Sequence, residues 1–179
     1  MPEPVWRRLA VPAAASLADL SSALLVAFGW HASHLSAFWT GEPWRGTCYR
    51  SRMELDHFGG EGSPSDGVAV GTVLHGAGDE LCWIYDYGDE WRHWITAEPL
   101  ADDPTDRFRC IDGANAAPPE DCGGEPGYRN MLEAIADPAH PEHDELVEWL
   151  GGPFDPSSFS VETIDHALAQ VPVLGVTPA

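Results

Sequence analysis

Apolar residues recur at helical spacing near the start of the chain, in SLADLSSALLVAF at positions 16–28. Side chains three and four positions apart fall on one face of a helix. The apolar residues with this spacing are Leu17, Leu20, Leu24 and Phe28. Ser16 and Asp19 have the spacing of a capping box, and Gly29 stands where helices commonly end. The pattern predicts a helix over residues 16–28 with one buried face.

The segment HLSAFWT, residues 34–40, alternates with a period of two, which is typical of a strand. We therefore expect His34 to stand on a strand. Residues 41–80 carry eleven glycines and prolines and show little periodicity, so they predict a long, partly irregular excursion. Within it, VAVGTVL at 68–74 is compatible with a strand or a one-turn helix.

Two aromatic runs, LCWIYDY and EWRHWITAE, flank Gly88 and Asp89 and predict a β-hairpin. If these two residues form the whole loop, Ile84 pairs with His93. Asp86 and His93 then become diagonal neighbours on one face of the sheet, within joint reach of one ion or water. A bulge at the glycine would change this parity.

The last third of the chain returns to helical spacing. The segments are GYRNMLEAIADP, PEHDELVEWLGG and a stretch near residues 160–170. A helix, then strands, then helices predict an α+β fold with a small, mostly antiparallel sheet. The N-terminal helix packs on this sheet, and residues 126–170 form a helical C-terminal part. A length of 179 residues suits one domain over residues 1–179.

Charge restricts the possible partners. Nine basic residues against 29 acidic ones give a formal charge of −20, which repels phosphate backbones and makes nucleic acid an unlikely partner. The same field attracts cations and basic peptides, although a well-solvated acidic surface is the simpler explanation of the charge. The longest clean apolar run, ALLVAF, is far too short to span a bilayer, so we expect a cytoplasmic protein with no membrane contact.

The four cysteines contain no C-x-x-C pair, which leaves free thiols as the simplest interpretation. They are Cys48, Cys82, Cys110 and Cys122. The chain also lacks the G-x-S-x-G, phosphate-loop, H-E-x-x-H and dinucleotide-binding motifs. Serine-hydrolase, nucleotide-hydrolysing and dinucleotide-dependent activities are therefore not expected.

Four separated stretches together resemble the plasmid pRiA4b ORF-3-like family. They are VWRRLAVPAAASLADL, GWHASHLSAF, YDYGDEWRHWI and PPEDCGGEPGYRNMLEAIADPAHPEHDELVEWLG. The resemblance implies a small α+β protein from a family whose members are often encoded within insertion elements. It implies no particular enzymatic reaction. Two features depart from the family. Relatives usually have an extra strand before V-W-R-R, whereas this sequence starts at Met1, so either that edge strand is absent or the true start lies upstream. Relatives also tend to have a cysteine just before P-P-E-D, where this chain has Ala117, which weakens the case for a thiolate-rich metal site.

The family pattern falls on polar residues within apolar segments, where burial is costly unless each group finds a partner. The candidates for acid–base or ligand roles are His34, Asp86, His93, Glu120 and Asp121. Candidate binding residues are Asp89, Trp91, Cys122 and Tyr128. We expect His34, Asp86, His93 and at least one of Glu120 and Asp121 to line one cavity. His34, Asp86 and His93 are the candidate ligands of a divalent metal.

Each residue also has a structural interpretation. Asp86 is a common turn residue, and His93 could be a core histidine bonded to a carboxylate. Glu120 or Asp121 could cap the helix that follows. His140 and His143 have the spacing of metal ligands, but they flank a helix start among acidic residues, where solvent exposure is expected.

Three classes of function remain. The first is an acidic binding module whose polar pocket, flanked by aromatics, receives a peptide, protein or small molecule. The second is a hydrolytic enzyme, assisted by a metal, that uses the same pocket. The third is an accessory protein of a mobile element, which the family resemblance suggests and the charge opposes.

Overall fold

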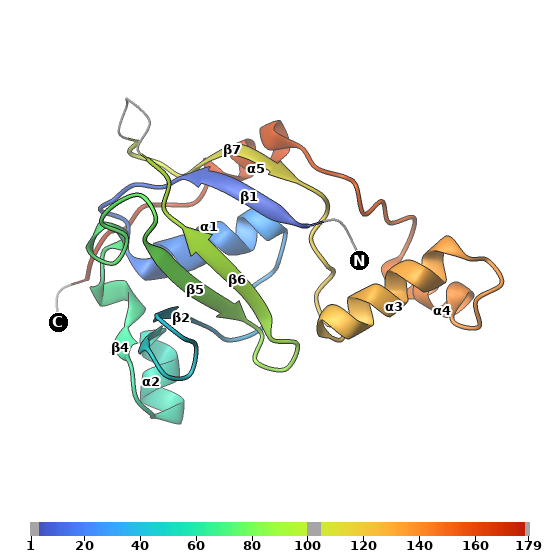
Figure 1. Ribbon diagram of the computed structural model, residues 1–179, viewed down its shortest axis with the longest axis horizontal. Helices are drawn as coiled ribbons and strands as arrows, with labels where there is room; N and C mark the ends of the chain where they lie inside the picture. The colour runs from blue at the N-terminus through green and yellow to red at the C-terminus, as the bar shows by residue number, and fades with distance from the viewer. Residues whose placement is uncertain (1–3, 100–104, 178–179) are drawn as a thin grey trace.

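The computed structural model describes residues 4–99 and 105–177 (Figure 1). In this part of the chain, the α-helices are α1 (Leu17–Phe28), α2 (Arg52–Phe58), α3 (Gly124–Ala136), α4 (His143–Leu150) and α5 (Val161–Leu168). Single 3₁₀ turns occur at Ser65–Gly67 and Val70–Thr72. None of these helices combines the length and apolar character needed to cross a membrane.

The strands form two sheets. The larger has the order β4-β3-β2-β5-β6 and consists of β2 (Ser36–Thr40), β3 (Thr47–Arg50), β4 (Ser63–Pro64), β5 (Glu80–Tyr85) and β6 (Trp91–Thr96). The smaller pairs β1 (Trp6–Ala10) with β7 (Arg109–Ala114). Only the short β3–β4 pair is parallel among these pairings. The predicted α+β class with mostly antiparallel strands is confirmed.

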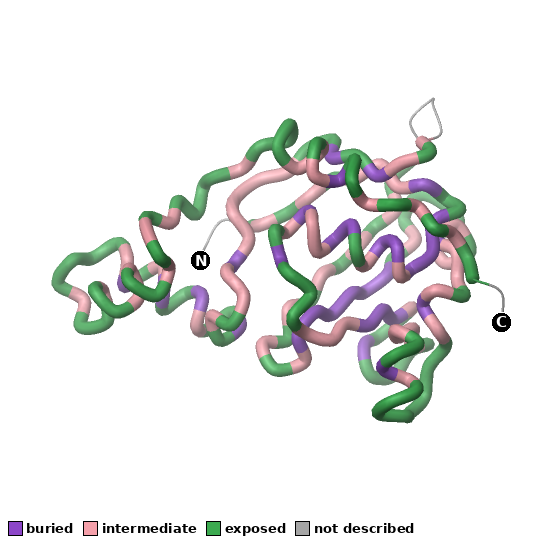
Figure 2. Tube along the Cα trace, turned by 180° about the vertical axis from the view of Figure 1, so that it is seen from behind, coloured by how far each residue is buried: buried purple, intermediate pink, exposed green. Residues whose placement is uncertain are grey.

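Helix α1 forms as its sequence predicts. The Ser16 side chain accepts a hydrogen bond from the Asp19 backbone at 3.0 Å, and the Asp19 carboxylate accepts one from the Ser16 backbone at 2.9 Å. Gly29 ends the helix in the left-handed conformation, with φ +73°. The apolar face packs on the large sheet, and Figure 2 shows buried residues concentrated along α1 and these strands.

Strand β5 is the centre of the core, because both of its faces are covered. Leu81, Trp83 and Tyr85 pack with the α1 side chains. Cys82 and Ile84 point to the other face and pack with Trp39 and Ala37 of β2. All β5 side chains from Leu81 to Tyr85 are at most 1% exposed.

The β5–β6 hairpin forms, but its predicted register is wrong. Tyr85 pairs with Trp91 and Trp83 pairs with His93, so the loop contains five residues rather than two. Asp86 and Glu90 at its ends have φ of +58° and +56°, and the Glu90 backbone donates to the Asp86 carbonyl at 2.6 Å. This longer loop changes the parity, and His93 shares the α1-facing side of the sheet with Trp83.

Two further expectations need correction. Strand β2 begins at Ser36, so His34 lies in the loop before it rather than on the strand. Residues 41–80 hold more regular structure than expected, since they form β3, α2 and β4. Within 68–74, the 3₁₀ turn agrees with the one-turn helix that was one of the two predicted forms.

The predicted C-terminal helices all form, but they occupy two places. Helix α5 packs on β7, where the Asp165 carboxylate accepts a hydrogen bond from the Cys110 backbone at 3.0 Å. Helices α3 and α4 pack on each other to one side of the sheets (Figure 1). Residues 1–3, which precede the V-W-R-R segment where the additional strand was considered, lie outside the described residues.

Candidate functional site

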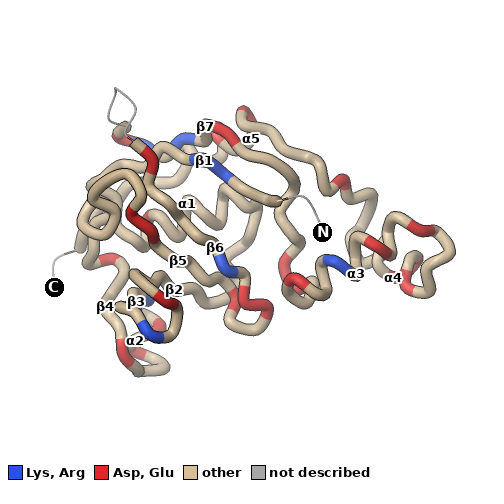
Figure 3. The backbone as a smooth tube through the Cα atoms, in the orientation of Figure 1, with Lys and Arg blue, Asp and Glu red and all other residues tan. Residues whose placement is uncertain are grey.

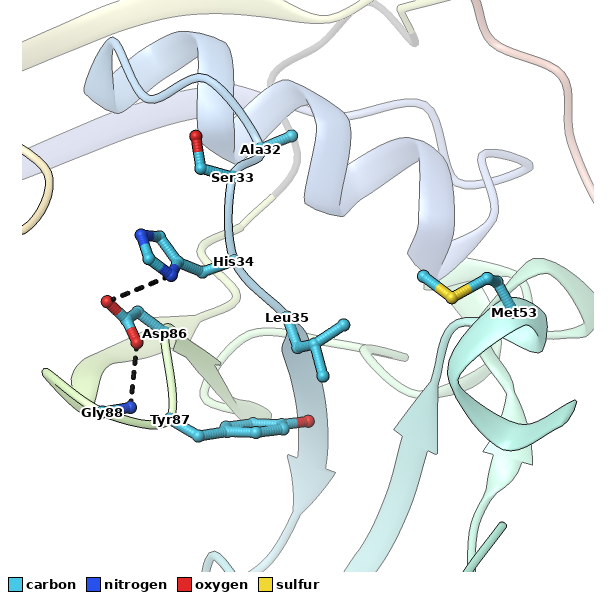
Figure 4. Close-up of a pocket in the computed structure, with 8 residues that line it drawn as sticks. All are labelled: Ala32, Ser33, His34, Leu35, Met53, Asp86, Tyr87 and Gly88. Carbon is cyan, nitrogen blue, oxygen red and sulfur yellow. Dashed lines mark hydrogen bonds and ion pairs between the residues drawn. The ribbon is translucent and has the colours of Figure 1, made fainter. Parts of the chain in front are cut away.

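Three loops bring His34 together with two carboxylates. The loop between α1 and β2 carries His34, the β5–β6 loop carries Asp86, and the loop before α3 carries Asp121. His34 Nδ1 lies 3.5 Å from Asp86 Oδ2, and His34 Nε2 lies 3.0 Å from Asp121 Oδ1. Figure 4 shows the His34 ring and the Asp86 carboxylate facing each other. We call these three residues the His34 cluster.

The backbone at this site adopts an uncommon conformation. Ala32, Asp86 and Asp121 have φ of +59°, +58° and +60°, in the left-handed region that non-glycine residues seldom occupy. Aspartate tolerates this region because its short side chain can bond to nearby backbone. Asp86 Oδ1 accepts a hydrogen bond from the Gly88 backbone at 2.8 Å. One Asp86 carboxylate oxygen therefore makes the turn hydrogen bond that the sequence predicts, and the other lies next to His34.

A second polar network fixes the loop that carries Asp121. The Tyr85 hydroxyl donates to Glu120 and accepts from the Ser33 backbone at 3.1 Å. His31 Nδ1 lies 3.2 Å from the other Glu120 oxygen. Burial opposes ionisation of Glu120, but the hydrogen bonds from Tyr85 and His31 outweigh it and lower the pKa of this carboxyl. Glu120 is therefore an anionic anchor beside the His34 cluster.

A cavity of about 410 Å³ opens next to the cluster. Its lining consists of Ala32, Ser33, His34, Leu35, Met53, Asp86, Tyr87 and Gly88 (Figure 4). His34 and Asp86 thus line one cavity, as expected. Asp121 contacts His34 from the neighbouring loop, and Glu120 accepts the hydrogen bond from Tyr85. Neither Asp121 nor Glu120 is part of the cavity lining.

The hydrogen bonding of His34 is incomplete. Its Nε2 atom is buried and has no hydrogen-bond partner, although Asp121 Oδ1 is near. The distance allows an ion pair, but the carboxylate oxygen is not placed to accept a hydrogen bond from this nitrogen. Among the described residues, the one group of three or more His, Cys, Asp and Glu side chains placed to hold a metal is the His34 cluster, whose ligand atoms lie within 4.8 Å of one another.

His93 is not part of this cluster, contrary to expectation. The rings around it belong to Phe28, Trp83 and Trp30, with centroids 4.6, 4.9 and 5.4 Å from its own. Nδ1 lies 3.1 Å from the Trp91 carbonyl oxygen. Burial lowers the pKa of His93 to about 4, so the ring is neutral at physiological pH. The core-histidine interpretation fits, with a backbone carbonyl in place of the expected carboxylate.

The proposed binding residues Asp89, Trp91, Cys122 and Tyr128 lie where the hairpin meets α3. Asp89 Oδ2 accepts a hydrogen bond at 3.1 Å from the backbone of Gly123, which is the N-cap residue of α3. The N-cap position considered for Glu120 or Asp121 is therefore occupied by a glycine, which has no capping side chain. The rings of Trp91 and Tyr128 meet edge to face, 6.5 Å apart. Burial raises the pKa of Cys122 to about 12, which keeps this thiol protonated.

Close backbone contact also joins the hairpin to α3. A Cβ atom at Gly124 would lie 2.6 Å from the Asp89 carbonyl oxygen, so a side chain there would separate the two segments. Figure 3 shows acidic residues at the hairpin tip and at the adjacent start of α3. His143, in contrast, lies away from this junction, with Nδ1 2.9 Å from the Ala134 carbonyl oxygen.

Sequence reasoning missed His31, Ser33 and Tyr85 as members of the polar network. The available signal was the segment W-H-A-S-H, in which two histidines and a serine follow the end of α1. Tyr85 gave no such signal, because an aromatic residue on a buried strand is ordinary core material.

The chain is similar to known proteins in both sequence and structure. It is 35% identical over 159 residues to the uncharacterized protein y4hQ of Sinorhizobium fredii, covering 82% of this chain and 74% of that protein. The crystal structure of MM3350, a protein of unknown function from Methanosarcina mazei Go1, is similar with a TM-score of 0.66 and 28% identity, covering 89% and 87% of the two chains. The family described as plasmid pRiA4b ORF-3-like protein matches residues 1–163, and the chain belongs to this family.

Proposed function

We propose that this protein is a binding module that holds a divalent transition-metal ion at the His34 cluster, beside the cavity that receives its peptide or protein ligand. The observation that carries this proposal is the buried His34 Nε2 atom, which has no hydrogen-bond partner although the His34 ring lies between the carboxylates of Asp86 and Asp121. A buried nitrogen without a partner costs about 1–3 kcal/mol, and a bound cation offsets that cost.

The ligand set and its spacing suit such an ion. Imidazole and carboxylate bind zinc and neighbouring transition metals. Bonds of about 2.0–2.2 Å place two ligand atoms of one ion at most about 4.4 Å apart. Ligand atoms within 4.8 Å of one another need only a small side-chain adjustment to meet this limit. The Asp121 side chain, which is 68% exposed, has the freedom to make it.

The cavity supports ligand binding next to the ion. Leu35 and Met53 give it apolar surface, while Ser33 and His34 give it polar groups. This combination is typical of sites that orient a ligand by a few polar contacts. A formal charge of −20 also favours the approach of a cation or a basic peptide.

Metal-assisted hydrolysis is the second candidate. It draws on the same geometry, because three protein ligands beside an open cavity leave a coordination position for water, which a bound metal makes more acidic. In that case His34 and Asp86 orient the ion, and the cavity receives the scissile group.

Calorimetric titration of the purified protein with Zn²⁺, Co²⁺ and Mn²⁺ tests the proposal. We expect one site per chain, an increase in Tm on binding, and loss of both in His34→Ala and Asp121→Asn. His75→Ala is a matched control, since His75 Nδ1 lies 3.7 Å from Asp79 without belonging to a three-ligand group. Equal binding by wild type and His34→Ala would contradict the proposal. Turnover of activated esters by the metal-loaded protein, lost in His34→Ala, would favour the hydrolytic candidate.

A further inference from the structure

A second cavity, of about 530 Å³, lies on the other face of the large sheet from α1 and shares Tyr87 with the first. Aromatic residues Trp39, Trp44 and Tyr87 line it, together with Arg50 and Glu61. We propose that this cavity binds a quaternary ammonium group, such as the trimethylammonium head of a small metabolite or a methylated lysine side chain.

The three aromatic rings contact one another at inclined angles rather than in a stack, and Trp39 is the most buried of them, with 3% of its surface exposed. The Trp39 and Trp44 centroids are 4.8 Å apart with their planes at 55°, and those of Trp44 and Tyr87 are 5.7 Å apart at 65°. Ring faces attract cations through their quadrupole, and surrounding rings are the usual way in which proteins recognise quaternary ammonium ions.

The chain holds Trp44 at this cavity at a conformational cost. Trp44 is 56% exposed and has φ +66°, which is unfavourable for a bulky side chain. The turn beneath it is tight, because a Cβ atom at Gly46 would lie 2.1 Å from the Thr40 carbonyl oxygen. The indole nitrogen donates to Glu90 at 3.4 Å, which fixes the direction of the ring. A large ring kept exposed in this way is expected at a binding surface.

The charges around the cavity favour a cation despite Arg50. The Arg50 guanidinium binds Glu54 through two nitrogens at 2.8 Å and the Gly59 carbonyl through the third at 3.0 Å, so each of its nitrogens already has a partner. Glu54 is fully buried, accepts a further hydrogen bond from Tyr87, and has one oxygen without a partner. Glu61 on the wall adds a negative charge that the Arg50–Glu54 pair does not cancel.

The aromatic part of the wall favours an alkylated cation. A primary ammonium or guanidinium group needs several hydrogen-bond acceptors, and the ring faces of Trp39, Trp44 and Tyr87 supply none, although Glu61 supplies a carboxylate. Burial raises the pKa of Cys48 to about 11, so the thiol on this wall is protonated and a poor metal ligand. A quaternary ammonium group needs neither acceptors nor metal ligands.

Calorimetric titration with choline and with 3,3-dimethyl-1-butanol, its uncharged isostere, tests this inference. We expect saturable choline binding about ten-fold tighter than binding of the isostere, equivalent to about 1.4 kcal/mol, which lies in the range of a cation–π interaction. Trp44→Ala should abolish the choline signal and Glu61→Gln should weaken it. Trp94→Ala is the matched control, because Trp94 is 55% exposed but does not line the cavity.

Several results would overturn the inference: no choline binding, equal binding of the isostere, or equal losses in Trp44→Ala and Trp94→Ala. A peptide with trimethyllysine, tested beside its unmethylated form, distinguishes the two sources of the group. Tighter binding of the methylated peptide than of choline indicates a protein ligand, and the reverse indicates a metabolite. His34→Ala should leave choline binding unchanged, so this test is independent of the metal site.

Discussion

His34 and His93 lie in two contrasting regions around the same strand. Before β2, the His34 ring meets the carboxylates of Asp86 and Asp121 where three loops converge. On β6, the His93 ring faces α1 among aromatic rings, and its polar partners are backbone groups, with Nδ1 3.1 Å from the Trp91 carbonyl oxygen. Both residues occur in aromatic-rich sequence, so residue type and local composition do not separate them.

The contrast shows what turns a histidine into a candidate ligand. His34 lies at the end of the sheet, where loops from distant parts of the chain can each contribute a carboxylate. His93 lies within a strand pair, where the neighbouring positions are filled by core side chains. Convergence of loops, rather than the sequence around each histidine, therefore distinguishes the polar site from the aromatic core.

The largest expected effect tests the aromatic core around His93. Trp83 is fully buried beside the His93 ring, so Trp83→Ala should lower the free energy of unfolding by about 3–5 kcal/mol. Trp94→Ala removes the same side chain from the neighbouring strand, where it is 55% exposed, and should cost far less. Chemical denaturation of both variants measures the difference. Equal losses would contradict the assignment of the two faces.

The elements that could be predicted from sequence are those with local signals. Helix α1 has an apolar stripe, a capping box and a terminal glycine within fourteen residues, from Ser16 to Gly29. Helix α2 has seven residues, too few to establish a period, although Ser51 and Gly59 mark its ends. The β1–β7 pairing joins segments about 100 residues apart, with an irregularity between Arg8 and Leu9, and no local pattern indicates it.

The residues of the candidate site could be predicted only in part. The family resemblance identified His34, Asp86 and Asp121 as candidates, and the structure brings these three together. The place of His93 depended on the hairpin register, which a five-residue loop with left-handed Asp86 and Glu90 determines. Because side chains alternate between the two faces of a strand, a register shift of one residue moves every side chain to the other face. The conformation of this one loop therefore determines that His93 faces α1 and lies outside the His34 cluster.

A smaller effect should appear in the pH dependence of stability. The folded-state pKa of His93 is about 4, below its ordinary value of 6.5. Between these values the unfolded chain binds a proton that the folded protein excludes, so stability decreases as the pH falls from about 6.5 to 4. The loss attributable to His93 is at most about 3 kcal/mol.

His93→Gln removes this proton-binding group and should flatten that part of the pH profile. Denaturation at a series of pH values measures the difference between wild type and variant, which cancels contributions from the carboxylates. His75→Gln is the control, since it makes the same substitution at a histidine whose side chain is 74% exposed. Parallel profiles for wild type and His93→Gln would show that the His93 ring is not enclosed by the aromatic core.

The smallest expected effect on stability concerns Asp121, and it separates folding from binding at the His34 cluster. The Asp121 side chain is 68% exposed, and exposed ion pairs contribute little, so Asp121→Asn should change the metal-free stability by no more than about 0.5–1 kcal/mol. The same variant should lose the stabilisation that Zn²⁺ gives to wild type, because a neutral amide is a poor replacement for a carboxylate ligand. Thermal denaturation with and without Zn²⁺ measures both quantities. A large loss of metal-free stability with an unchanged response to Zn²⁺ would make Asp121 a structural partner of His34. The two histidines would then differ only in which neighbours stabilise the fold, and the His34 cluster would have no role in metal binding.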